Sequence, residues 1–353
     1  MNNRAATPGL AGASRMEVGY WLTRRWTMHR DGGHIRRMHE RGAHGFRLVF
    51  MLATLLAPSD GAKAACEIVH LADVPVQIVA DVPVVGVEVN GVTLPFVFDT
   101  GAQRSLVTDA TVQRAALRLD EWAATTVKGI SGYERHRNAD PASLTLGGIA
   151  LRRRTLVRDS TLTVGPLPQG ALADHDVAGL LGADFLGGFD LDVDIAHGRL
   201  SLYRVAGCTA PSLGRSLPWP TGHTAIAASA PIRDVLTIPV ELDGVPLRAE
   251  IDSGSAIGLL TASGIDRMGL SVEVLAHDPG GSVSGIGRFA VAMRRHRFTT
   301  LQVGAEHIAA PAVWAAPVHI LPVVDMLLGS DWLRQRRVWF SYATAQIFVA
   351  TGS

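Results

Sequence analysis

Short runs of apolar and β-branched residues, interrupted at regular intervals by glycine and other turn residues, make up most of the chain from residue 76 onward. Two pairs of these runs enclose an Asn-Gly or Asp-Gly step: 84–89 and 93–98 around Asn90-Gly91, and 236–242 and 245–251 around Asp243-Gly244. Such steps are strong hairpin signals, because both central residues of a tight hairpin turn adopt positive φ. The pattern predicts one β-hairpin at the corresponding place in each half of the chain.

The same order of elements follows each predicted hairpin. A short helical stretch comes first, then a glycine-bearing hairpin tip, further strands and a closing pair of strands. The predicted ranges are 109–117, 129–133, 143–157 and 190–203 in the first half, and 261–268, 282–287, 297–313 and 338–350 in the second. Regular short strands separated by turn residues favour an all-β, barrel-like unit in each half.

The spacing of motifs indicates that the two halves are copies of one unit. Asp99 lies nine residues after Asn90, and the second copy repeats this spacing between Asp243 and Asp252. A Ser-Gly pair follows each of Asp99 and Asp252 at offsets 32 and 33. A Leu-Leu-Gly-x-Asp segment begins at residue 180 and again at residue 327. An internal repeat of this kind defines the organisation better than length does.

The repeat sets the predicted domain boundaries. We expect an N-terminal lobe at 65–204 and a C-terminal lobe at 231–353, joined by a linker at 205–230 that is rich in proline, glycine, serine and threonine. A length of 353 residues suits two domains. With 47% apolar and 18% charged residues, the composition excludes a disordered chain.

Residues 1–64 have the features of a targeting segment. The apolar run 48–57 is too short to span a bilayer and suits a signal-peptide core, with Arg41 and Arg47 before it. Ala62-Lys63-Ala64 offers a cleavage site, so the mature chain is expected to begin at Ala65. The sequence therefore predicts an exported protein, periplasmic or secreted, without a stable membrane span.

Residues 1–64 carry an excess of positive charge, and they contain more than one candidate start residue. They hold 10 of the 33 Lys and Arg but 4 of the 32 Asp and Glu, which leaves the remainder with 23 basic against 28 acidic residues. No basic patch with interleaved aromatics occurs, so nucleic acid is not an expected partner. Because the basic stretch before Arg41 is long for a signal peptide, Met28 and Met38 are alternative starts. The histidines of this segment are not expected to bind metal: His29, His34, His39 and His44.

Only two cysteines are present, Cys66 and Cys208, and three states are open to them. In an oxidising compartment they would form one disulfide between the N-terminus and the linker, which is the favoured state. Lipidation of Cys66 is disfavoured, since Lys63 puts a charge where a lipidation signal needs an apolar residue. Free thiols are the third state.

Each copy ends its second hairpin strand at an aspartate followed by a hydroxyl residue and glycine: Asp-Thr-Gly at 99–101 and Asp-Ser-Gly at 252–254. A single Asp-x-Gly is often only a turn. Two of them at matched positions would meet at a pseudo-twofold axis. Two adjacent carboxyls share one proton, so one takes a proton from water while the other gives one to a carbonyl oxygen. No metal-binding or phosphate-loop motif occurs, so no metal or cofactor is expected.

These motifs resemble those of the aspartic proteases, and specifically two retropepsin-type units fused in one chain, over nearly all of residues 76–350. The resemblance implies an all-β fold with two pseudo-symmetric β-barrel lobes, short helices, and an active site between the lobes. Pepsin-like enzymes share the paired aspartates but have a flap in one lobe only, whereas both copies here have one.

The resemblance also implies the roles of individual residues. Asp99 and Asp252 are the catalytic pair, and Thr100 and Ser253 brace their two loops. Neighbouring residues support the pair: Gly101, Ala102, Gly254 and Ser255. Residues expected in a ψ-shaped loop behind it are Leu181, Gly182, Leu328 and Gly329. Flap and substrate-binding residues are Ile130, Ser131, Gly132, Tyr133, Ser284, Gly285 and Ile286. Tyr133 is equally consistent with closing over substrate and with facing solvent.

Four further aspartates are not assigned to catalysis. Asp184 and Asp331 follow the Leu-Leu-Gly motifs and are expected to cap short helices. Asp192 and Asp194 alternate on a predicted strand and are expected to be surface charges.

The two copies differ after their glycines, where Ala102 corresponds to Ser255. A hydroxyl that donates to a carboxylate lowers its pKa. We therefore expect Ser255 to make Asp252 the more acidic partner and to leave the shared proton mostly on Asp99.

The sequence thus predicts an aspartic endopeptidase, a hydrolase that cleaves peptide bonds with a water activated by the aspartate pair. A monomer would suffice, because one chain supplies both halves as an intramolecular dimer. The expected substrate is an extended polypeptide between the flaps and the aspartates, cleaved best at apolar–apolar junctions. The alternative is a non-catalytic peptide-binding or interaction module on the same fold. The presence of both aspartates favours the enzyme.

Overall fold

The computed structural model describes residues 65–130, 132–152, 162–167, 171–220, 222–232, 234–285, 289–320 and 324–351. The targeting segment predicted at 1–64 lies outside this part of the chain. Within the described residues, none of the helices has the length and apolar character needed to cross a membrane.

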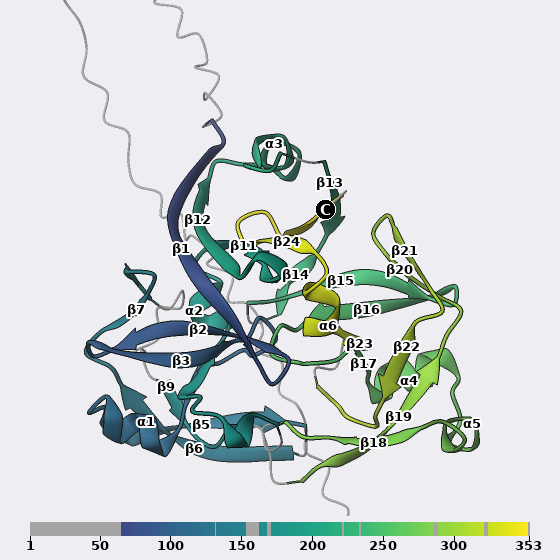
Figure 1. Ribbon diagram of the computed structural model, residues 1–353, viewed down its shortest axis with the longest axis horizontal. Helices are drawn as coiled ribbons and strands as arrows, with labels where there is room; N and C mark the ends of the chain where they lie inside the picture. Colours follow the sequence, from purple (N-terminus) through teal and green to yellow (C-terminus); the bar gives the residue numbers. More distant parts are fainter. Residues whose placement is uncertain are drawn as a thin grey trace, which may run out of the picture. The chain divides into compact units, whose positions relative to one another are not determined.

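The first copy is built almost entirely of strands (Figure 1). Its elements are β1 (Glu67–Val79), β2 (Val82–Val89), β3 (Val92–Phe98), β4 (Leu106–Val107), α1 (Asp109–Arg114), β5 (Arg118–Gly129), β6 (Gly132–Asp140), β7 (Leu144–Leu146), β8 (Ile149–Ala150), β9 (Leu162–Val164), a 3₁₀ turn at Ala171–Asp174, β10 (Gly179–Leu181), α2 (Ala183–Leu186), β11 (Asp190–Asp194), a 3₁₀ turn at Ile195–His197 and β12 (Arg199–Ala206).

The second copy repeats this order after two connecting elements. The connecting elements are α3 (Ala210–Ser216) and β13 (His223–Ala227), and the copy contains β14 (Ser229–Ile232), β15 (Val235–Leu242), β16 (Val245–Ile251), β17 (Leu259–Leu260), α4 (Ala262–Met268), α5 (Val272–Ala276), β18 (Gly280–Val283), β19 (Val291–Arg297), β20 (Thr300–Val303), β21 (Glu306–Ala309), β22 (Ala312–Ala315), β23 (Met326–Leu328), α6 (Ser330–Leu333), β24 (Arg337–Ser341) and β25 (Gln346–Ala350).

The predicted hairpins are confirmed in both copies. Strand β2 pairs with β3, and β15 pairs with β16, each around a two-residue turn. Asn90 and Gly91 have φ of 50° and 81°, and the corresponding Asp243 and Gly244 have 47° and 78°. All four values lie in the left-handed region that this turn requires. The turn chemistry therefore fixes the same strand register in each copy.

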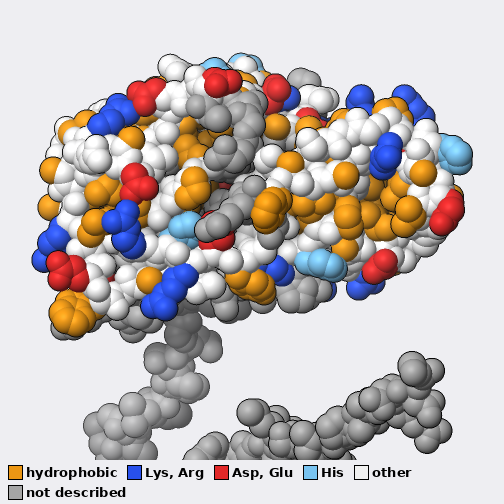
Figure 2. Space-filling model, turned by 90° about the horizontal axis from the view of Figure 1, so that it is seen from below, with side chains coloured by type: hydrophobic (Ala, Val, Ile, Leu, Met, Phe, Trp, Pro, Cys, Tyr) orange, Lys and Arg blue, Asp and Glu red, His pale blue; other side chains and the backbone are white. Residues whose placement is uncertain are grey.

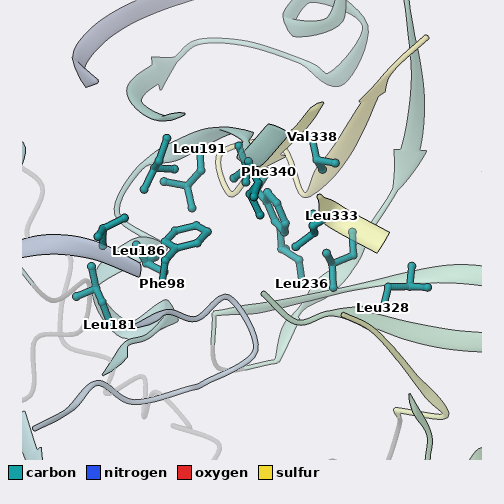
Figure 3. Close-up of a cluster of buried hydrophobic side chains, with 14 of the residues drawn as sticks. Phe98, Leu181, Leu186, Leu191, Leu236, Leu328, Leu333, Val338 and Phe340 are labelled. Atoms are coloured by element: carbon teal, nitrogen blue, oxygen red, sulfur yellow. The ribbon is translucent and has the colours of Figure 1, made fainter. Parts of the chain in front are cut away.

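The two copies also join directly, because the closing strands β11 and β24 pair antiparallel with Leu191 opposite Phe340. This pairing extends the first sheet, in which β12 and β1 continue on one side and β25 and β13 on the other. Apolar side chains from both copies form one cluster behind this junction (Figure 3). Its labelled members are Phe98, Leu181, Leu186 and Leu191 from the first copy, and Leu236, Leu328, Leu333, Val338 and Phe340 from the second.

The expectation that Asp192 and Asp194 are surface charges is wrong. Their exposed fractions are 0% and 5%, since β11 lies between β12 and β24. Asp192 accepts hydrogen bonds from Arg337 at 2.9 and 2.5 Å and from the Trp219 indole at 3.1 Å. Asp194 accepts hydrogen bonds from His197 and Arg199 at 2.7 and 3.3 Å. Buried carboxylates of this kind are stabilised by their partners.

The N-terminal strand is tied to the segment that follows β12. Cys66 forms a disulfide with Cys208, next to the antiparallel pairing of Glu67 with Ala206. Strand β13, within the stretch 205–230, pairs with β25. The exact lobe and linker boundaries stay a prediction.

Candidate active site

Both aspartates are held at the ends of central strands. Strand β10 runs parallel to β3 and β23 runs parallel to β16, with Leu181 opposite Phe98 and Leu328 opposite Ile251. Beyond these pairs, the Asp99 amide donates to the Leu181 carbonyl at 3.0 Å, and the Asp252 amide donates to the Leu328 carbonyl at 2.9 Å. The leucines expected in the ψ-shaped loops thus fix the backbone at the two acids.

The glycines of the Leu-Leu-Gly motifs allow the chain after each triplet to pass closely. A Cβ on Gly182 would lie 2.7 Å from the Ala102 carbonyl oxygen, and one on Gly329 would lie 2.4 Å from the Ile257 carbonyl oxygen. Real Cβ atoms do not approach backbone so closely, so any side chain here would displace the loop that carries an aspartate.

Thr100 and Ser253 join the two loops through a symmetric set of hydrogen bonds. The Ser253 amide donates to the Thr100 hydroxyl at 3.1 Å, and the Thr100 amide donates to the Ser253 hydroxyl at 3.0 Å. The Thr100 hydroxyl donates to the Ile251 carbonyl at 2.6 Å, and that of Ser253 donates to the Phe98 carbonyl at 2.7 Å. Both side chains are buried. Each copy therefore positions the acid of the other.

The two carboxyls face one another across this junction. Oδ1 of Asp99 accepts from the amides of Gly101 and Ala102 at 3.0 and 2.8 Å. In the second copy, Oδ1 of Asp252 accepts from the amides of Gly254 and Ser255 at 2.9 and 3.0 Å. A Cβ on Gly101 would lie 2.5 Å from Asp252 Cγ, so a glycine is needed for the acids to meet.

Burial and mutual repulsion make these acids hold a proton. Removal from water raises the pKa of Asp99, although two backbone amides oppose the shift. The pKa of Asp252 is raised further, by burial and then by the negative charge of Asp99. The hydrogen bond between the carboxyls lowers the pKa of Asp99 and raises that of Asp252. The two acids therefore titrate as a pair that shares one proton.

The expected hydrogen bond from the Ser255 hydroxyl to Asp252 is not made. The Ser255 hydroxyl donates to the Ile257 carbonyl at 2.8 Å, while the Ser255 amide donates to Asp252. The Ala102 amide makes the same bond to Asp99. The hydroxyl therefore does not distinguish the two acids.

The acids lie on the floor of a cavity of about 450 Å³. Segments of both flap hairpins, β5–β6 and β18–β19, line it from the opposite side. The flap tips touch, since a Cβ on Gly285 would lie 2.5 Å from Cδ1 of Ile130. Most of the other lining side chains are apolar, which is typical of ligand sites.

A model of the aspartyl protease family matches the chain in two segments, residues 85–185 and 238–332. Each segment contains one aspartate triplet and one Leu-Leu-Gly motif, and together they cover more than half of the chain. The chain belongs to the aspartyl protease family. In this protein the two matched segments are the two retropepsin-like units that the repeat predicts.

The aspartic proteinase from Irpex lacteus is similar with a TM-score of 0.45 and 11% sequence identity, over 82% of this chain and 98% of that chain. No curated protein matches.

The flap residues of this aspartyl protease fall into three groups. Ile130, Ser284 and Gly285 line the cavity. Tyr133 is 72% exposed and lies beneath the Lys128 ammonium, so it faces solvent, and neither it nor Gly132 lines the cavity. The predicted flap residues outside the described part of the chain are Ser131 and Ile286.

The helix-cap expectation for Asp184 and Asp331 needs correction, because the capping positions are Gly182 and Gly329. Asp184 instead accepts from the amide and hydroxyl of Ser105 at 3.0 and 2.7 Å. Asp331 accepts from the Gly258 amide at 3.0 Å. These carboxylates hold the chain that follows each triplet of the aspartyl protease.

Sequence reasoning missed one acid of the site, Glu250, which is 1% exposed and lines the cavity. It lies on β16 two residues before Asp252. Side chains alternate along a strand, so a residue two positions before a catalytic acid lies on the same face. The alternation of side chains along the strand that ends at Asp252 was the sequence signal that could have identified Glu250.

Proposed function

We propose that this aspartyl protease is an active endopeptidase. The single observation that supports this most strongly is that two buried acids, one from each copy, meet on the floor of one cavity, where they share one proton. An ionised and a protonated carboxyl side by side are what acid–base hydrolysis of a peptide bond requires.

In the proposed reaction, the Asp99 carboxylate takes a proton from a water molecule as its oxygen attacks the carbonyl carbon of the peptide bond. Asp252 gives its proton to the carbonyl oxygen, which produces a neutral tetrahedral diol. Asp99 then gives the proton it took from water to the amide nitrogen, while Asp252 takes a proton back from a hydroxyl of the diol. The C–N bond breaks, the amine and the carboxylic acid leave, and the two acids return to their starting state. Both acids keep their positions, because the Thr100 and Ser253 bonds hold their loops.

The substrate is proposed to be an extended polypeptide that lies between the flaps and the floor. Its backbone would pair with the flap strands as an added strand, and its apolar side chains would enter the apolar parts of the cavity. Figure 2 views the molecule from the side on which β5, β6 and β18 lie in Figure 1, and shows hydrophobic side chains between scattered charged ones.

We also propose that the protein works outside the cytoplasm. The apolar run at 48–57 with its cleavage site supports export, and the Cys66–Cys208 disulfide suits an oxidising compartment. Fractionation of producing cells, with N-terminal sequencing of the mature chain, tests this. A new N-terminus at Ala65 is expected, and an uncleaved cytoplasmic chain would contradict export.

Cleavage of a denatured protein tests the enzyme assignment. The variants Asp99→Asn and Asp252→Asn should each lose roughly 10²- to 10⁴-fold in kcat/KM, the range for a lost acid or base. Asp266→Asn makes the same change at an exposed site on α4 and should retain full activity. Binding of unfolded chains without any cleavage by the wild type would instead support the non-catalytic peptide-binding module.

A further inference from the structure

Glu250 places a third carboxyl next to the aspartate pair. Its Oε1 lies 2.6 Å, and Asp252 Oδ1 2.7 Å, from the point that a Cβ on Gly101 would occupy. Two atoms this close to one point are near neighbours. Glu250 also lines the cavity in which the pair lies.

No group of the described residues balances this carboxyl. Its Oε2 is buried without a hydrogen-bond partner, and none of the salt bridges among the described residues includes it. Burial, and then the charges of Asp252 and Asp99, raise its pKa well above the ordinary value of 4.5. The other charged group that lines the cavity is Lys128, on the flap, whose ammonium lies 5.8 Å from the centre of the Tyr133 ring. A buried carboxyl without a partner is costly for the folded protein.

Neither the fold nor the aspartate pair requires this acid, because the first copy does without it. Val97 occupies the matching position, two residues before Asp99, and packs in a cluster of apolar side chains. The residue opposite Val97 on the neighbouring strand is Val84, whereas the residue opposite Glu250 is Thr237. Thr237 is fully buried, and its hydroxyl also lacks a partner among the described residues. The second copy therefore has two polar side chains next to each other, Thr237 and Glu250, where the first copy has two valines.

We propose that Glu250 determines specificity: the subsite on the second-copy side of the cleft binds a basic substrate side chain, Lys or Arg. The subsite on the first-copy side, near Val82 and Leu180, takes an apolar side chain. This inference rests on the proposed endopeptidase function and names its substrate class. It replaces the apolar–apolar junction expected from the sequence with one apolar and one basic side chain.

A basic side chain supplies what Glu250 lacks. An ammonium or guanidinium group would donate charge-assisted hydrogen bonds to the carboxylate in a site with little water. The long aliphatic stem of Lys or Arg would pack on the apolar lining of the cavity, near Leu259 and Leu327. An aliphatic substrate side chain of the same length would leave the buried carboxyl without a partner.

Matched peptide substrates test this proposal. Each pair is identical except for Lys or norleucine at one position beside the cleaved bond, and both sides of the bond are tested. The full-length wild type is compared with Glu250→Val, which reproduces the Val97 packing, and with Glu250→Gln, which keeps the shape. Glu241→Gln, at an exposed position on β15, is the control for charge alone.

We expect the wild type and Glu241→Gln to prefer Lys over norleucine at least tenfold in kcat/KM on one side of the bond. In Glu250→Val and Glu250→Gln this ratio should fall to one or below, while cleavage of the norleucine peptides continues. A Lys to norleucine ratio near one in the wild type would contradict the role of Glu250, and so would a ratio in Glu250→Val equal to that of the wild type. Neither result would contradict the proposed endopeptidase function. Wild type that cleaves none of the peptides would contradict the proposed function itself.

Discussion

At the scale of single residues, burial and neighbouring charge distinguish the two aspartates, which have almost identical backbone partners. Each Oδ1 accepts two amides of its own loop. What differs is the presence of Glu250 next to Asp252. The asymmetry of this site therefore comes from Glu250, two positions before the triplet, and not from Ser255, directly after it.

Ser255→Ala should leave the acidic limb of the pH profile of kcat/KM unchanged, because the hydroxyl it removes donates to Ile257 and not to Asp252. The Ser255 amide, which does donate to Asp252, remains in the variant. The measurement is the profile of both proteins on one peptide across the acidic range. An upward shift of about half a pH unit or more would show that the hydroxyl stabilises the ionised pair.

Glu250→Val should raise the free energy of unfolding near neutral pH by about 1–3 kcal/mol, since it removes a buried carboxyl without a partner. The raised pKa of Glu250 means that the folded state binds more protons, so the stability of the wild type falls as pH rises above 4.5. The difference between the proteins should thus be small below pH 4.5 and should grow above it.

Urea unfolding at several pH values measures this effect, with Glu241→Gln as the control. A variant that is less stable than the wild type at neutral pH, or a difference that does not depend on pH, would mean that Glu250 has a stabilising partner.

At the scale of elements, local signals predict the parts that local chemistry determines. Asn90-Gly91 and Asp243-Gly244 require positive φ at both positions, so the hairpins and their register are readable from sequence. The Leu-Leu-Gly motifs were readable because they recur at the same distance from each triplet. The partners of Ser105 and Asp184 were not, because these residues are 79 apart in sequence and meet only in the fold.

Ser253→Ala should destabilise the protein by about 1–3 kcal/mol, because it leaves the Thr100 amide and the Phe98 carbonyl buried without their partner. The looser loops should lower kcat more than they raise KM, since the acids lose alignment while the cavity remains. Ser143→Ala, at an exposed position, is the matched control. Equal stability and kcat in the two variants would show that the bonds between the loops do not hold the acids.

At the scale of the whole molecule, the two copies are one structural unit. Strands β11 and β24 pair across the copies, and their side chains enter a shared core (Figure 3). For this reason the alternation of residues along the strand wrongly predicted that Asp192 and Asp194 are surface charges. The pattern within one strand cannot show that a strand from the other copy will cover it. Glu250 was missed in a related way, because a lone charge on a strand has no motif.

The junction between the copies should depend on the ion pair between Asp192 and Arg337, which joins β11 to β24. Arg337→Ala removes the cation that pairs with Asp192, whose exposed fraction is 0%. Loss of one partner of a buried pair lowers the free energy of unfolding by about 3–5 kcal/mol. The exposed pair of Arg334 with Asp81 is the control, for which Arg334→Ala should cost less than about 1 kcal/mol. Calorimetry should show a lower Tm for Arg337→Ala in a single transition, since the copies share a sheet and a core. Two separate transitions in the wild type, or equal losses in the two variants, would contradict a joint between the copies that this pair stabilises.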